Sequence, residues 1–185
     1  NQILGFAGIG ILINLRLSRH NIVALQDNRI LCRTCRGLVH RLTVGAGLGG
    51  CVISPFTEGE QRKNLWVTTK LRDSEQGYDS ARKAFDRQLG LLQLDYVDMY
   101  MLHWPTPFDW RSSETWKAFQ EFRAEGRVRT LGVCNFLPEH LDRLHEETGE
   151  YPAVNQIELH PTWQQREVVD YCKAHGIAVE AYSPM

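Results

Sequence analysis

The chain has 185 residues, of which 43% are hydrophobic and 23% are charged, a composition typical of a globular protein with room for one core. Its 21 lysines and arginines are balanced by 22 aspartates and glutamates, so the formal net charge is only −1. Because no surplus of positive charge is available to neutralise phosphates, we do not expect nucleic acid to be a partner.

The cysteine content indicates a reducing compartment. Five cysteines is an odd number, and they are scattered along the chain, so a disulfide framework is not favoured and we expect a cytoplasmic protein. The apolar run at residues 3–15 is shorter than the roughly 20 residues that a membrane-spanning helix needs. We expect this run to form a buried helix or strand pair, and we expect no membrane partner.

The first third of the chain differs in its sequence pattern from the rest. Residues 1–60 show no regular alternation of strand-like and helix-like segments, and we assign no strands there. The sequence pattern changes near residues 58–64. We therefore divide the chain into an atypical N-terminal segment at 1–60 and a second unit at 61–185.

From about Leu65 onward, strand-like and helix-like segments alternate. Strands are expected at 65–71, 97–104, 129–136, 153–160 and 177–184. Helices are expected at 79–93, 112–126, 138–149 and 164–176. The first helix should be capped by Asp79 or Ser80, the third should start at Pro138, and glycines should end the third and fourth. Helices of this length between strands predict parallel β/α units.

Such units form either a doubly wound sheet or part of a (β/α)₈ barrel. A barrel is favoured, because polar residues recur at the ends of the expected strands, where barrels carry their chemistry. These residues are Lys70, His103, Asn135, Gln156, Glu158, His160 and Tyr182. With five recognisable units, we expect an incomplete TIM barrel whose C-terminal part is missing.

Lys70 and His103 end consecutive strands, so both can face one pocket at the mouth of the sheet. A lysine lowers the pKa of a neighbouring phenol, and a neutral imidazole can hydrogen-bond a carbonyl oxygen. On the pattern alone, a solvated lysine and a structural histidine remain open alternatives.

Five stretches carry a family resemblance: "LWVTTKL", "LDYVDMYMLHWP", "EGRVRTLGVCNF", "PAVNQIELHP" and "VEAYSP". They follow one another in order between residues 64 and 184. In these stretches the chain resembles the aldo-keto reductases, in particular members similar to diketogluconate reductases and prostaglandin F synthases. The resemblance implies a (β/α)₈ barrel that reduces aldehydes and ketones with NADPH, held across the barrel mouth without a Rossmann domain.

The resemblance also implies roles for residues on the substrate side. Lys70 matches the lysine that lowers the pKa of the family's proton-donating tyrosine. His103 matches the histidine that positions the substrate carbonyl, and Trp104 would line the substrate pocket.

Four further residues match positions on the cofactor side. Asn135 and Gln156 stand where the family binds the nicotinamide carboxamide, and Tyr182 stands where an aromatic ring stacks on the nicotinamide. Cys134 occupies a position that is commonly serine in the family, and its thiol is the weaker hydrogen-bond donor.

The chain departs from the family pattern in its proton donor. The family's aspartate and tyrosine precede the lysine strand, but this chain has no tyrosine before Tyr78, and the only aspartate before its lysine strand is Asp27, which lies outside any matching motif. Arg72 also replaces an aromatic residue. We therefore expect this chain to reduce aldehydes poorly or not at all.

The function expected from the resemblance is NADPH-dependent reduction of small carbonyl compounds. The alternative is a catalytically inactive, truncated relative that acts as a binding or interaction protein. Open strand edges in an incomplete barrel also predict self-association.

Two local patterns in the N-terminal segment compete with this interpretation. "GAGLGG" at 45–50 fits a dinucleotide-binding loop by its letters, but Pro55 lies where a helix should follow, and a flexible turn is favoured. Cys32, Cys35, His40 and Cys51 could supply four zinc ligands, but their spacing matches no familiar zinc site. We predict no metal.

Overall fold

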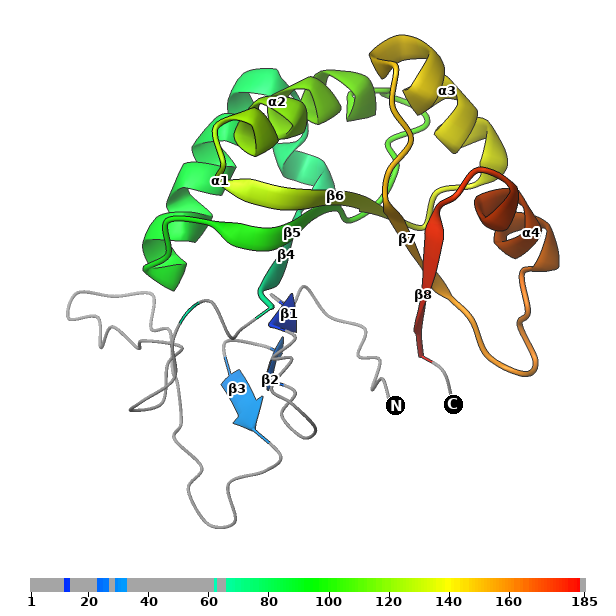
Figure 1. The fold of residues 1–185 in the computed structure, drawn as a ribbon, viewed down its shortest axis with the longest axis horizontal. Helices are drawn as coiled ribbons and strands as arrows, with labels where there is room; N and C mark the ends of the chain where they lie inside the picture. The colour runs from blue at the N-terminus through cyan, green and yellow to red at the C-terminus, as the bar shows by residue number, and fades with distance from the viewer. Residues whose placement is uncertain (1–11, 14–22, 27–28, 33–61, 63–65, 184–185) are drawn as a thin grey trace.

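The computed structural model describes residues 12–13, 23–26, 29–32, 62 and 66–183. Within them, the main feature is a five-stranded parallel sheet whose strands lie side by side in chain order (Figure 1). The strands are β4 (Thr68–Leu71), β5 (Val97–Leu102), β6 (Val128–Cys134), β7 (Val154–Glu158) and β8 (Ala178–Tyr182).

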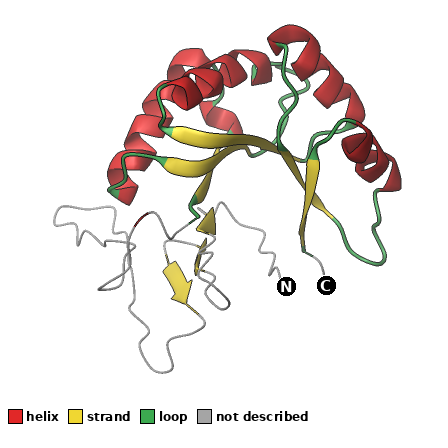
Figure 2. Cartoon of the chain, in the orientation of Figure 1, coloured by secondary structure: helices red, strands yellow, loops and turns green. Residues whose placement is uncertain are grey.

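A helix follows each of the first four strands of this sheet, and a short 3₁₀ helix, η2 (Asp73–Glu75), precedes the first of them. The helices are α1 (Tyr78–Leu92), α2 (Ser112–Ala124), α3 (Pro138–Thr148) and α4 (Arg166–Ala174). Figure 2 shows them along the same, outer side of the curved sheet. The alternation expected from the sequence is therefore present.

The helix ends follow the sequence in part. Pro138 begins α3, and Gly149 ends it with a φ of 77°, a left-handed conformation that glycine adopts without strain. The expected cap of α1 is wrong: the helix begins at Tyr78, with Gly77 at the cap position and no side-chain cap. The φ of Gly77 is 116°, a backbone conformation that glycine adopts more readily than other residues, which explains why glycine occupies this position.

Strands β4 to β7 are buried on both faces, as parallel strands commonly are, whereas β8 is only partly buried. Residues such as Leu71, Tyr100 and Val133 face the helices and belong to the main core. Alternate residues, including Met101 and Cys134, form a second, smaller cluster on the opposite face. Because side chains alternate along a strand, Lys70 lies on the face of Met101, with which it is in register.

The N-terminal part contains strands that sequence reasoning did not assign. β1 (Leu12–Ile13), β2 (Val23–Gln26) and β3 (Arg29–Cys32) form an antiparallel sheet in that order. The missing alternation with helices hid them, since short antiparallel strands need no helix between them. Most of the apolar run, the "GAGLGG" stretch and three of the four possible zinc ligands lie outside the described residues. Among those described, no helix has the length and apolar character to cross a membrane.

Candidate active site

Lys70 and Gln156 meet near the C-terminal ends of their strands, although two strands separate them. Lys70 lies in β4 and Gln156 in β7, yet the lysine Nζ donates a hydrogen bond to the glutamine Oε1. Cys134 of β6 approaches the same oxygen, with 3.7 Å between Sγ and Oε1. Curvature of the sheet thus gathers three of the predicted site residues on its inner face.

Asn135 connects a second group of predicted residues. Its Nδ2 donates to the backbone oxygen of His103 over 3.1 Å, and its Oδ1 accepts from the Tyr182 hydroxyl over 2.9 Å. Its own backbone N–H donates to the carbonyl of Gln156 over 2.9 Å. The left-handed φ of 61° at Asn135, which asparagine tolerates better than most residues, turns the chain here. Asn135 therefore links the ends of β5, β6, β7 and β8.

His103 follows β5 directly and is held by its backbone N–H, which donates to the carbonyl of Leu71 over 3.1 Å. Burial lowers the pKa of its imidazole, and the nearby Lys70 cation lowers it further. Asp73 opposes this shift from a distance of 3.9 Å between Oδ1 and the histidine Nδ1. The balance favours a neutral imidazole at neutral pH.

Trp104 comes next in the chain and is a large apolar residue that is 43% exposed. Its ring lies edge-on to that of His103, with 6.4 Å between the centroids. An exposed indole beside a partly buried imidazole provides one apolar and one polar surface for a small ligand.

The thiol of Cys134 is buried, and that burial raises its pKa to about 12. It is therefore neutral at physiological pH and is not a reactive thiolate. Burial also raises the pKa of the Tyr182 phenol, with further contributions from Glu158 and Cys134.

Sequence reasoning missed two residues near this site. Asp73 approaches His103, and the buried Gln76 donates to the carbonyl of Trp104. Both follow β4 within a few residues, where an acid or amide after a strand looks like any loop residue. A polar side chain after a strand end indicated a site residue only where the family resemblance also gave that position a role.

The sequence model described as the aldo/keto reductase family matches residues 46–185, which is more than half of the chain. This chain belongs to the aldo/keto reductase family. The expected resemblance and the TIM-barrel fold class are confirmed, and the five parallel strands with their four helices form part of such a barrel.

Three relatives illustrate the similarity within the aldo/keto reductase family. An aldo-keto reductase of Mycolicibacterium smegmatis is 50% identical over 127 residues, which are 69% of this chain and 46% of the relative. The glyoxal reductase of Bacillus subtilis is 41% identical over 127 residues, covering 69% and 45%. A crystal structure of a Gox0644 mutant in complex with NADPH has 44% identity and a TM-score of 0.64, covering 66% of this chain and 45% of that one. The chain thus spans about half the length of the curated relatives it matches.

Proposed function

We propose that this chain provides the carbonyl-binding and nicotinamide-binding part of an NADPH-dependent reductase of small aldehydes and ketones. The observation that carries the proposal is the convergence of Lys70, His103, Asn135, Gln156 and Tyr182 through direct hydrogen bonds at the strand ends. The relative named glyoxal reductase supports the substrate class, and the NADPH-bound neighbour supports the cofactor.

The donor set suits a carboxamide ligand. Lys70 occupies Oε1 of Gln156, which leaves Nε2 as the donating end, and within the described residues Nε2 donates to no partner. An amide donor of this kind can serve a carbonyl oxygen such as that of nicotinamide. When bound, NADPH would supply the hydride. We assign Gln156 and Asn135 to its carboxamide, Tyr182 to its ring face, and Cys134 to packing beneath them.

The substrate side follows from the charge that builds on a carbonyl oxygen as the carbon is reduced. Donors already in place stabilise that charge best. We assign His103 to hydrogen-bond the oxygen, Lys70 to add positive charge nearby, and Trp104 to form the apolar wall. The proton donor is not among them, because no tyrosine precedes Lys70 in a recognisable motif. General acid catalysis is worth about 10²- to 10⁴-fold, so we expect cofactor binding with slow turnover. Such a protein would act in the cytoplasm.

The test separates cofactor binding from chemistry. Titration calorimetry should show that NADPH binds to the unmodified chain. The Gln156→Leu variant should bind it at least about tenfold more weakly, because the carboxamide of the nicotinamide would lose its hydrogen-bond donor. Methylglyoxal-dependent oxidation of NADPH, followed by absorbance, should be slow and should fall further in Lys70→Met and His103→Ala. Lys117→Met in α2 and His175→Ala just after α4 are matched controls and should change neither reading.

Two results would contradict the proposal in different ways. Absence of NADPH binding by the folded chain would favour the alternative, a non-catalytic interaction protein. Turnover of about 1 s⁻¹ or faster is an ordinary enzyme rate. Such a rate would show that the chain has a proton donor other than the residues assigned here, and the expectation of slow turnover would be wrong.

A further inference from the structure

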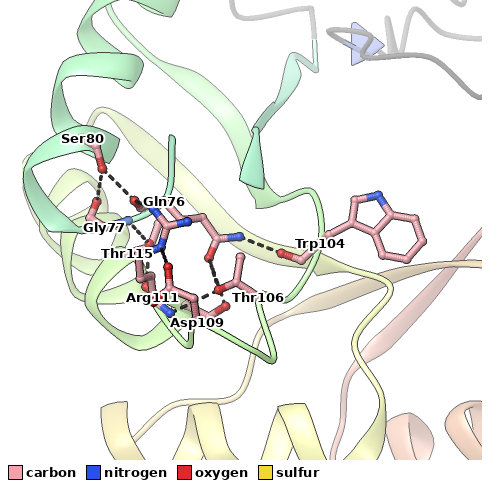
Figure 3. A network of polar contacts seen from close by, with 9 residues as sticks. Gln76, Gly77, Ser80, Trp104, Thr106, Asp109, Arg111 and Thr115 are labelled. Atoms are coloured by element: carbon pink, nitrogen blue, oxygen red, sulfur yellow. Dashed lines mark hydrogen bonds and ion pairs between the residues drawn. The ribbon is translucent and has the colours of Figure 1, made fainter. Parts of the chain in front are cut away.

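Gln76 is a buried amide outside the residues assigned above. It lies between η2 and α1 and is 1% exposed. Its Nε2 donates to the backbone oxygen of Trp104 over 2.7 Å, while its Oε1 accepts from Ser112 Oγ over 3.1 Å and from Thr106 Oγ1 over 3.3 Å. Figure 3 shows the side chain reaching across to Trp104 and Thr106. Both ends of one carboxamide are therefore bound to the connection between β5 and α2.

The backbone around Gln76 adds further links to the same connection and to α2. The Gln76 carbonyl accepts from Arg111 Nη1 over 2.9 Å, and the N–H of Gly77 donates to Thr115 Oγ1 over 2.8 Å. Thr106 Oγ1 also accepts from the backbone N–H of Arg111 over 3.2 Å. The loop after β4 and the loop after β5 are thereby joined into one unit (Figure 3).

This unit fixes the backbone that carries the pocket residues. The carbonyl of His103 is held by the Asn135 amide at 3.1 Å, and the carbonyl of the next residue, Trp104, is held by the Gln76 amide. Two carboxamides, one from the loop after β4 and one from the residue just after β6, thus hold consecutive peptide groups. Trp104 is 43% exposed, so the position of its ring depends on how firmly its backbone is held.

We propose that Gln76 is a positioning residue that sets the placement of Trp104 and, through it, how tightly a carbonyl substrate is accepted. The proposal rests on the proposed function for its substrate, but the coupling of Gln76 to Trp104 stands on the contacts alone. A partly buried backbone oxygen that loses its donor is left without a partner, so the loop should move to find another one. Trp104 moves with it.

The first test does not depend on catalysis. The full chain is labelled with 5-fluorotryptophan, and the Trp104 resonance is assigned with Trp104→Phe. In Gln76→Met, which keeps the shape of the side chain but removes both polar ends, the fluorine resonance of Trp104 should shift or split. The resonances of Trp116 and Trp163 should stay in place. Gln120→Met, which removes a carboxamide that bonds Thr148 and Glu150, is the matched control and should leave Trp104 unchanged.

A second variant covers the case in which Gln76→Met does not fold. Gln76→Glu keeps an acceptor for the two hydroxyls but, once ionised, cannot donate to the Trp104 carbonyl. Acidification should restore the donor and move the Trp104 resonance back toward that of the unmodified chain. An unmoved Trp104 resonance in either folded variant overturns the proposal.

The kinetic test addresses the substrate. In Gln76→Met, the KM for an aldehyde should rise about three- to tenfold, the range of one net hydrogen bond, while the Kd for NADPH stays unchanged. The added effect of Gln76→Met in a Trp104→Ala background should be smaller, since both act through one side chain. Equal effects in both backgrounds would contradict the route through Trp104. If NADPH does not bind but the Trp104 resonance still responds, the proposed function fails while the coupling stands.

Discussion

His103 is a residue whose ionisation should leave a measurable trace on stability. Burial, aided by Lys70, lowers its pKa in the folded chain, whereas in the unfolded chain it titrates near its ordinary value of about 6.5. Below that value the unfolded state binds the proton more readily. The stabilising contribution is therefore complete above about pH 6.5 and is lost as the pH falls toward the folded-state pKa.

We expect the free energy of unfolding to decrease more steeply with acidification in the unmodified chain than in His103→Asn. Urea unfolding between about pH 5 and pH 7.5 measures this difference. His140, whose pKa is also lowered by burial, contributes in the same direction, so some dependence should persist in His103→Asn and weaken further when His140→Asn is added. Identical slopes for the unmodified chain and His103→Asn would show that the folded site tolerates the imidazolium.

At the scale of single elements, Asn155 of β7 determines how β6 ends. Its side chain is fully buried, its Nδ2 donates to the carbonyl of Phe136 over 2.8 Å, and its Oδ1 accepts from the N–H of Phe136 over 3.3 Å. Phe136 follows Asn135, so this pairing fixes the left-handed turn that carries the site asparagine.

Replacing Asn155 by leucine should therefore lower the free energy of unfolding by about 2–3 kcal/mol, because two buried backbone groups lose their partner. Denaturant unfolding gives the value. Gln120→Met, which removes a carboxamide with partners at 3.0 and 3.4 Å near an exposed surface, should cost less than about 1 kcal/mol. A small effect of Asn155→Leu would mean that water satisfies Phe136 once the amide is gone.

These elements also show how far the sequence alone leads. The β/α alternation after residue 65 was predictable because each strand is a short apolar run and each helix has its own period. The strand-end residues were predictable because parallel strands bring their C-terminal ends together. The roles of Asn155 and Gln76 were not predictable from the sequence. Each role depends on the backbone groups that the side chain contacts, and those groups are 19 and 28 residues away in the chain. β1 to β3 were missed because short antiparallel strands leave little pattern.

For the whole molecule, the outer edge of β8 is the feature with the broadest consequence, since among the described residues β8 pairs only with β7. The N–H of Ala178 donates to the carbonyl of Ala153, the residue just before β7. The carbonyl of Tyr182 accepts from the N–H of Leu159, the residue just after β7. In a parallel strand, alternate residues bond to the same side, so Val179 and Ala181 direct their peptide groups to the open edge. An edge of this kind can pair with another chain, which is the physical basis of the expected self-association.

Ala181→Pro should block that pairing at little cost to the fold, because proline removes an N–H that faces away from β7. Sedimentation velocity should show concentration-dependent association of the unmodified chain and a shift toward monomer in Ala181→Pro, with similar cooperative melts. Glu180→Pro is the matched control one residue earlier: its missing N–H faces β7, so this change should lower the melting temperature instead. A monomeric unmodified chain at high concentration would show that the β8 edge is already protected. Association that persists in a well-folded Ala181→Pro chain would place the contact on another surface.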